Sequence, residues 1–268
     1  VPMPVIQANR IGTDPTGQFA MPNRFEGITL TGPARIGGAG AGEGNQISGN
    51  GVPAAGLGTG IATFGAGAAG SVIQGNVIGL ASNPGTPVTL LPNGYSGITI
   101  YGDSHDVLIG GDAPGEANTI AGNLAAGIAL YGGGDGEEGG LPQRITIAGN
   151  AIVNNGGLGI DLDDDGVTPN DPGDTDLGTN NGMNFPVLSN AANGLAATTQ
   201  VDFDATNLLG NPYTLRFFAS TTCDPSGHGE GERLVGVLSL FANGTGTMVL
   251  SELVPLGQAI TATATDLY

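Results

Sequence analysis

The sequence predicts an all-β protein: a parallel β-helix solenoid over residues 1–187, followed by a small antiparallel β-sandwich over residues 188–268. Two observations lead to this prediction. The segment 35–50 (RIGGAGAGEGNQISGN) returns as 108–123 (LIGGDAPGEANTIAGN). A repeat at this offset, about 73 residues, is typical of a solenoid, in which each coil buries its apolar face against its neighbours. After about Phe185 the repeat stops, and longer segments with alternating apolar residues begin.

The repeated phrases are predicted to be strands. In GITIYG (97–102), Ile98 and Ile100 face one way, whereas Thr99 and Tyr101 face the other. Closely spaced Gly and Asn residues would interrupt any helix of normal length. Three strand-like phrases recur in each repeat unit, so we expect coils of roughly 23 residues, and about seven of them before Val187. The isoleucines expected to point inward are Ile28, Ile36, Ile47, Ile61, Ile73, Ile98, Ile100, Ile109, Ile120, Ile128 and Ile147.

The segments beyond Phe185 are predicted to form the antiparallel sandwich. The alternating stretches are 201–205, 215–219, 233–241, 246–250 and 259–265. About 80 residues is short for a seven-stranded sandwich, so we expect the chain to stop at or just before the last strand. At the other end, VPMPVIQANR already lies inside a repeat and lacks an initiator Met. We therefore expect the solenoid to be N-terminally truncated, and the missing signal peptide to say nothing about secretion.

The composition excludes some classes of partner. The chain has 24 Asp and Glu against 6 basic residues, all of them Arg, for a formal net charge of −18. Such a surface repels phosphate backbones and anionic membranes, so we expect no nucleic-acid partner and no membrane insertion. It suits a secreted protein or one that collects divalent cations. Cys223 is the single cysteine and can form no intrachain disulfide.

Five asparagines close an I-x-G-N or I-x-A-N phrase: Asn9, Asn50, Asn76, Asn123 and Asn150. They could line a binding groove. The interpretation we favour is structural, with each Asn in a left-handed turn and its amide bonded to the neighbouring coils.

The loop 159–182 (GIDLDDDGVTPNDPGDTDLGTNNG) is the one candidate functional site. It holds Asp161, Asp163, Asp165, Asp171, Asp174 and Asp176, together with Asp164, and no basic residue. The spacing Asp161-x-Asp163-x-Asp165-Gly166 matches the first half of an EF-hand-type calcium loop, where alternate carboxylates converge on one hard cation. The twelfth position is Pro172 instead of Glu, so Asp171, Asp174 or Asp176 would complete the shell. We expect calcium to brace the loop between the two domains; the alternative is a solvated acidic linker.

Several other polar residues are expected to be structural. Asp14 belongs to a Pro-Thr-Gly turn, and Glu137 and Glu138 to a Gly-rich insertion between coils. His105 and His228 lack the second His or Cys that a metal site requires.

Over essentially its whole length the chain resembles secreted bacterial right-handed parallel β-helix repeat proteins of the pectin-lyase-like fold. The solenoid phrases that carry the resemblance are Asn9–Gly17, Ile36–Asn50, Gly97–Gly102 and Ile109–Asn123. Gly159–Asp171, Asn184–Leu188 and Phe217–Asp224 resemble the segments by which such proteins pass into an immunoglobulin-like sandwich. The resemblance implies a right-handed coil, an extracellular or cell-surface location, and contact with polysaccharide or cell-surface glycan.

Two functions follow as hypotheses. The first is a non-enzymatic module for adhesion or carbohydrate contact, with no catalytic residues. The alternative is a polysaccharide lyase or glycoside hydrolase acting on acidic glycans, because proteins of the family that the chain resembles often cleave such glycans. A lyase needs a Lys or Arg base, but Arg10, Arg24, Arg35 and Arg144 are all distant from the acidic loop in sequence. A hydrolase needs two carboxylates on one rigid face, and no single strand offers such a pair.

Overall fold

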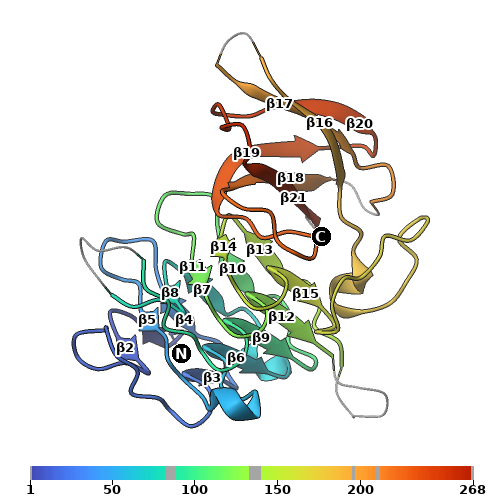
Figure 1. Ribbon diagram of the computed structural model, residues 1–268. Coiled ribbons are helices and arrows are strands. Elements are labelled where there is room, and N and C mark those ends of the chain that lie inside the picture. Colours follow the sequence, from blue (N-terminus) through green and yellow to red (C-terminus); the bar gives the residue numbers. More distant parts are fainter. Residues whose placement is uncertain (1, 83–87, 133–139, 195–196, 209–211, 267–268) are drawn as a thin grey trace. The chain divides into compact units, whose positions relative to one another are not determined.

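The computed structural model describes residues 2–82, 88–132, 140–194, 197–208 and 212–266 (Figure 1). Within this part, strands dominate and the helical segments are three short 3-10 turns: η1 (Pro53–Ala55), η2 (Ala66–Ala68) and η3 (Thr179–Gly182). No helix in these ranges is long and apolar enough to cross a lipid bilayer. The all-β prediction is confirmed. Glu137 and Glu138 lie outside the described residues.

The chain divides into two compact units, one of 1–167 with 178–180, the other of 168–177 with 181–268. The first is a parallel solenoid with three five-stranded sheets. The first sheet contains β1 (Val5–Ile6), β4 (Arg35–Gly37), β7 (Val72–Gln74), β10 (Leu108–Gly110) and β13 (Thr146–Ala148). The second contains β2 (Arg10–Ile11), β5 (Gln46–Ile47), β8 (Val77–Ile78), β11 (Thr119–Ala121) and β14 (Ala151–Val153). The third contains β3 (Ile28–Leu30), β6 (Ile61–Phe64), β9 (Ile98–Tyr101), β12 (Ile128–Tyr131) and β15 (Ile160–Leu162).

The coils are longer and fewer than expected. In the first sheet the register partners run Val5, Arg35, Val72, Leu108 and Thr146. Each step along this sheet therefore spans about half of the sequence repeat, and the chain passes the sheet five times. The predicted coil length of roughly 23 residues, although ordinary for a solenoid, is wrong, and so is the prediction of about seven coils. The sequence repeat is two coils with three strands each, and similar phrases of adjacent coils pair in the same sheet, as Ile28 does with Ile61.

The core of the solenoid is a stack of isoleucines. All the isoleucines expected to point inward belong to one apolar cluster, and ten of the eleven are buried. Ile147 is only partly buried because it lies in β13, the last strand of its sheet. The alternation in β9 is confirmed, since Ile98 and Ile100 are in the core whereas Tyr101 lies on the outer face.

Asparagine side chains form two continuous hydrogen-bonded ladders through the stack. In each, Nδ2 of one Asn donates to Oδ1 of the next at 2.8–3.0 Å. The first ladder is Asn9, Asn45, Asn76, Asn118 and Asn150. The second is Asn23, Asn50, Asn93, Asn123 and Asn155. The structural role predicted for the five asparagines is confirmed, but they belong to two ladders.

The turn geometry differs from the prediction in one respect. The left-handed residue is the one that precedes each of the five predicted asparagines: Ala8, Gly49, Gly75, Gly122 and Gly149, with φ between 58° and 73°. The Asn itself has an ordinary φ, which turns its amide into the stack. Glycine also allows close approach of coils, since a Cβ on Gly44 would clash with the carbonyl oxygen of Gly75.

The second unit contains two three-stranded antiparallel sheets. One consists of β16 (Val187–Asn193), β17 (Thr199–Asp204) and β20 (Thr245–Val249), in the order β16-β17-β20. The other consists of β18 (Tyr213–Ser220), β19 (Arg233–Leu240) and β21 (Ala259–Asp266), in the order β19-β18-β21. Both sheets supply one apolar core, in which Phe203 of β17 meets Phe217 of β18 edge to face at 6.1 Å. The antiparallel sandwich is confirmed, whereas its immunoglobulin-like character stays a prediction.

The ladders predict a strong dependence of stability on central asparagines. Asn76 is buried, and its Nδ2 also donates to the carbonyl oxygens of Ile36 and Gln74. Asn76→Ala leaves several buried polar groups without a hydrogen-bond partner, and each such loss costs about 1–3 kcal/mol. The free energy of unfolding should therefore fall by about 3 kcal/mol or more. The exposed Asn9→Ala, at the ladder's end, should cost less than about 1 kcal/mol. Urea unfolding measures both, and equal losses would contradict the greater importance of the buried, central asparagines.

Candidate functional site

The six aspartates of the predicted calcium loop are divided between the two units. Asp161, Asp163 and Asp165 belong to the solenoid unit, where they lie in β15 and directly after it. Asp171, Asp174 and Asp176 belong to the second unit. The sequence assigned the whole loop to the solenoid, whereas the unit boundary passes through it.

The first group of aspartates binds the loop's own backbone. Oδ1 of Asp161 accepts the backbone N–H of Gly166 at 3.2 Å. Oδ1 of Asp163 accepts the N–H of Thr179 at 3.1 Å, and the N–H of Asp163 donates to Oγ1 of Thr179, also at 3.1 Å. In the described part of the chain, no three-carboxylate cluster of metal-binding dimensions includes Asp161, Asp163 or Asp165. Asp161 and Asp163 instead use carboxylate oxygens to shape the turn.

The second group does converge. One carboxylate oxygen from each of Asp171, Asp174 and Asp176 lies within 4.8 Å of the other two. Asp174 is 8% exposed, and its Oδ1 accepts the N–H of Asn184 at 2.8 Å. Oδ2 of Asp171 accepts both the N–H and the hydroxyl of Thr175, at 3.0 and 2.8 Å.

Two oxygens of this second group are buried without a donor: Oδ1 of Asp171 and Oδ1 of Asp176. A buried carboxylate oxygen without a hydrogen bond is costly, and a bound cation relieves that cost. The donor set consists of oxygen alone, which is the set that calcium prefers over softer metals. The residues at Asp171, Asp174 and Asp176 therefore fit a hard divalent cation.

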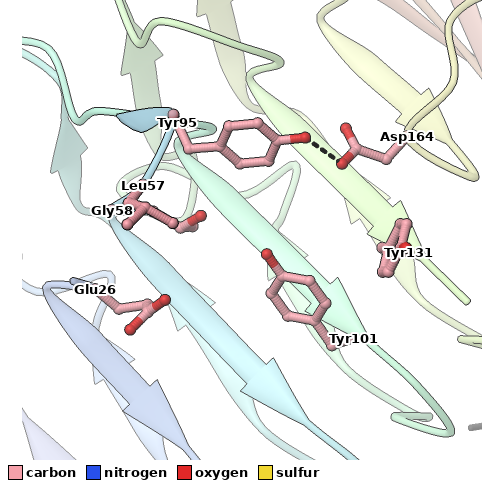
Figure 2. Close-up of a pocket in the computed structure, with 9 residues that line it drawn as sticks. Glu26, Leu57, Gly58, Tyr95, Tyr101, Tyr131 and Asp164 are labelled. Atoms are coloured by element: carbon pink, nitrogen blue, oxygen red, sulfur yellow. Dashed lines mark hydrogen bonds between the residues drawn. The ribbon is translucent and has the colours of Figure 1, made fainter. Parts of the chain in front are cut away.

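A second candidate site is a cleft of about 340 Å³ on the outer face of the third sheet. Its side chains come from different coils, and Figure 2 shows how they lie. The lining residues are Glu26, Gly56, Leu57, Gly58, Thr59, Tyr95, Tyr101, Tyr131 and Asp164. In Figure 2, Glu26 and Asp164 lie on opposite sides of the rings of Tyr95 and Tyr101.

The aromatic side of this cleft follows from strand register. Phe64 of β6 pairs with Tyr101 of β9, which pairs with Tyr131 of β12. The rings of Phe64 and Tyr101 stack with centroids 4.7 Å apart, and Tyr131 meets Tyr101 edge to face at 5.7 Å. Small residues lie beside the row, since Thr99 and Ala129 precede the two tyrosines by two positions and are fully buried. The result is a row of rings along the solenoid axis.

The charged side chains that line the cleft, Glu26 and Asp164, are both acidic. The hydroxyl of Tyr95 donates to Oδ2 of Asp164 at 2.5 Å, which pins the ring to the loop after β15. Burial, and then this hydrogen bond to Asp164, raise the pKa of Tyr95. Burial also raises the pKa of Tyr101, to which the charges of Asp164 and Glu26 add. None of the six arginines, all of which lie in the described ranges, lines the cleft.

Asp161 lies beside this cleft on the outer face, because it pairs in register with Ala129. It is 8% exposed, and burial raises its pKa to about 6. Burial likewise raises the pKa of Asp164. Asp161 and Asp164 are thus carboxyl groups held in a poorly hydrated environment, where they are less ready to ionise than ordinary aspartates.

The sequence predicts no cleft here and places only one of its residues, Tyr101, on the outer face. The alternation placed Tyr101 outward, and the similar phrases GITIYG and GIALYG would have placed Tyr131 beside it. Nothing in the sequence brings Glu26, Tyr95 and Asp164 to the same place, because each is far from the other two along the chain. These three residues lie in the same cleft because of the number of residues in each coil, which the sequence pattern does not show.

The other polar residues discussed from the sequence lie outside both candidate sites and make local contacts. Asp14 accepts the N–H groups of Gln18 and Phe19, as the predicted turn requires. His105 contacts Asp106 at 2.7 Å on the surface. His228 meets the ring of Phe185 edge to face at 5.5 Å. Cys223 is exposed and free.

The raised pKa of Asp161 predicts a pH-dependent stability of the solenoid. The folded pKa of about 6 lies above the ordinary value of 3.8, so stability should fall as pH rises through this window. Asp161→Asn keeps an acceptor for Gly166 and should be more stable than wild type at pH 7 by about 2–3 kcal/mol, but no more stable at pH 3. Asp112→Asn, at an exposed position on another loop of the solenoid, is the control. Urea unfolding across pH measures the difference, and parallel curves for wild type and Asp161→Asn would refute it.

Comparisons with protein-family models, curated proteins and solved structures give no match for this chain. The parallel β-solenoid implied by the sequence resemblance is present in the structure. Membership of the pectin-lyase-like family, the right-handed coil and secretion stay predictions. The described part of the chain offers two candidate sites: an acidic tyrosine cleft on the solenoid, and a three-aspartate cluster in the second unit.

Proposed function

We propose that the protein is a non-enzymatic, extracellular or cell-surface module that contacts carbohydrate through the tyrosine cleft of its solenoid. The main support for this proposal is that Tyr101 and Tyr131 form a row beside Tyr95, and that the carboxylates of Glu26 and Asp164 line the same cleft. The cleft volume of about 340 Å³ is at the lower end of the range for ligand sites, which is about 300–1,000 Å³.

The chemistry of the cleft suits sugar rings. Tyrosine combines apolar ring carbons with a polar hydroxyl, so the exposed parts of these rings can pack on the C–H groups of a sugar while the hydroxyls stay hydrated. One face of Tyr101 is covered by the stacked ring of Phe64, which leaves its other ring surfaces for the ligand. Carboxylates accept hydrogen bonds from ring hydroxyls more strongly than neutral acceptors do. A row along the solenoid axis repeats at the strand spacing of about 4.8 Å, close to the length of one sugar residue, and so favours a linear chain of sugars.

An acidic glycan is a poor ligand for this cleft. Each uronate carboxylate would enter beside Glu26 and Asp164, with no arginine in the lining to offset the repulsion. The same lining offers no Lys or Arg base for lyase chemistry. The substrate class in the alternative hypothesis is therefore disfavoured by charge.

A glycoside hydrolase remains the second candidate, because one cleft holds two carboxyl groups from different coils. Asp164 has a raised pKa, as a general acid requires, and Glu26 lies across the tyrosines from it. The distinguishing property is turnover. Release of new reducing ends in the binding experiment below, abolished by Glu26→Gln and by Asp164→Asn, would establish the enzyme and overturn the non-enzymatic proposal.

We further propose that calcium binds in the second unit at Asp171, Asp174 and Asp176. The two buried carboxylate oxygens without a donor support this, and they are absent from the Asp161–Asp165 half of the loop. Calcium at this cluster would supply the positive charge that three converging carboxylates lack. The brace between the two domains that the sequence predicts stays a prediction.

Carbohydrate binding is tested with a panel of neutral, amino and acidic oligosaccharides by isothermal titration calorimetry. Tyr101→Ala removes the central ring of the row; nucleic-acid bases stacked on an aromatic side chain lose about 1–3 kcal/mol on such truncation, and we expect a loss in the lower part of that range for a sugar ring. We expect affinity to fall by about tenfold or more. Phe19→Ala removes an exposed ring that does not line the cleft and should leave affinity unchanged. A panel without any binder, or equal affinity in Tyr101→Ala, would overturn the proposal.

Calcium binding is tested by thermal unfolding with calcium or chelator at matched ionic strength. With a Kd of about 0.1–1 mM, 10 mM calcium should stabilise the folded state by about 1.4–2.7 kcal/mol and raise Tm. Asp176→Asn removes one charge at an oxygen that accepts no hydrogen bond, and it should abolish the rise. Asp163→Asn with Asp165→Asn should keep it. The reverse pattern would place the ion in the first half of the loop, and no rise in any protein would refute the site.

A further inference from the structure

The tyrosine cleft combines aromatic rings with carboxylates and has no positive charge of its own. Glu26 and Asp164 line it from opposite sides, whereas the ion pairs of Asp106 with Arg144 and of Glu252 with Arg233 lie elsewhere. Arg24, close to Glu26 in sequence, stacks on the ring of Phe25 at 5.3 Å. The two cleft carboxylates therefore face the ligand without a protein counter-ion.

We propose that the ligand of this cleft is a glycan that carries free amino groups, such as an oligomer of glucosamine. This inference rests on the proposed carbohydrate contact and names its substrate class. The ammonium group of each amino sugar supplies the counter-ion that Glu26 and Asp164 lack, while the sugar ring packs on Tyr101 and Tyr131.

The tyrosines add to the selection for positive charge. A cation near an exposed face of an aromatic ring is attracted by the negative π-system, and the attraction is stronger where water is excluded. Tyr95 contributes indirectly, because its hydroxyl donates to Oδ2 of Asp164 and leaves Oδ1 of that carboxylate for the ligand. The hydrogen bond also holds the carboxylate in the cleft wall, so the Asp164 side chain loses little conformational entropy when the ligand binds.

Three related ligands should then bind with different affinities. A charge-assisted hydrogen bond is about twice as strong as a neutral one. Each ammonium–carboxylate contact should therefore strengthen binding about threefold over the same sugar with an acetylated amine. We expect tetra-glucosamine to bind about tenfold more tightly than tetra-N-acetylglucosamine. Tetra-galacturonate, with one negative charge on each ring, should bind more weakly than both.

The test is isothermal titration calorimetry of the full chain with these three tetrasaccharides and with tetralysine, at low salt and at a pH where the amines are protonated. In wild type the preference for tetra-glucosamine should shrink as salt is added, because the added contacts are ionic. Tetralysine carries the same ammonium groups without sugar rings and should bind more weakly than tetra-glucosamine.

Variants separate charge from aromatic contact. Glu26→Gln with Asp164→Asn removes both charges and keeps an acceptor for Tyr95, so the tenfold preference for tetra-glucosamine should disappear. Asp112→Asn with Glu116→Gln makes the same change in net charge outside the cleft and should leave the preference intact. Circular dichroism checks that each variant is folded; if the cleft double variant is not, the single variants Glu26→Gln and Asp164→Asn should each reduce the preference.

The outcomes distinguish this inference from the proposed function. If the acetylated and amino forms bind equally, carbohydrate contact stands and the selection for amino groups is wrong. If tetralysine binds as tightly as tetra-glucosamine, the cleft recognises ammonium groups in general and the glycan assignment is wrong. If no oligosaccharide binds, both fail. A preference for the amino form that survives in Glu26→Gln with Asp164→Asn would also overturn the inference.

Discussion

The rest of the molecule depends on coils that stack in register, and the asparagine ladders are the interaction that holds this register. Each ladder amide donates to the next ladder oxygen. In every rung except Asn23–Asn50 that oxygen also accepts the backbone N–H of the Asn before it, as Asn118 does for Asn76. The ladders therefore satisfy backbone groups at turns, where no strand partner is available. A slip of one residue would break every rung of both ladders at once and also turn the isoleucines outward.

The same register produces the candidate ligand site. Because partners such as Phe64, Tyr101 and Tyr131 align across coils, one outward position repeated in sequence becomes a continuous row in space. The core needs only the inward positions, so the outward ones are free to carry function. Carboxylates reach this row from loops of other coils, from Glu26 before β3 and from Asp164 after β15. A solenoid thus assembles a site from residues of distant coils without any long-range motif.

The acidic loop shows how the same residue type takes on different roles in different surroundings. Asp161 is buried beside the tyrosine cleft and has a raised pKa, whereas Asp163 binds the backbone and hydroxyl of Thr179. Asp171 and Asp176 each keep a buried oxygen without a donor. Among the aspartates of this loop, only this second group combines converging carboxylates with buried oxygens that lack a donor. The regular Asp161-x-Asp163-x-Asp165 spacing resembles a calcium loop, but Asp161 and Asp163 are used instead for local hydrogen bonds.

The sequence by itself determined the strands, the inward isoleucines, the structural role of the asparagines and the change to an antiparallel unit. These features follow from local alternation and from glycine at left-handed turns, which neighbouring residues encode. Only the tertiary structure decided how many strands close one coil, because that depends on strands such as Val77–Ile78, which are too short to show alternation. It also decided that Tyr95 meets Asp164 and that the acidic loop is divided between two units. Contacts between residues so far apart along the chain depend on the summed length of intervening loops, and no local pattern records that sum.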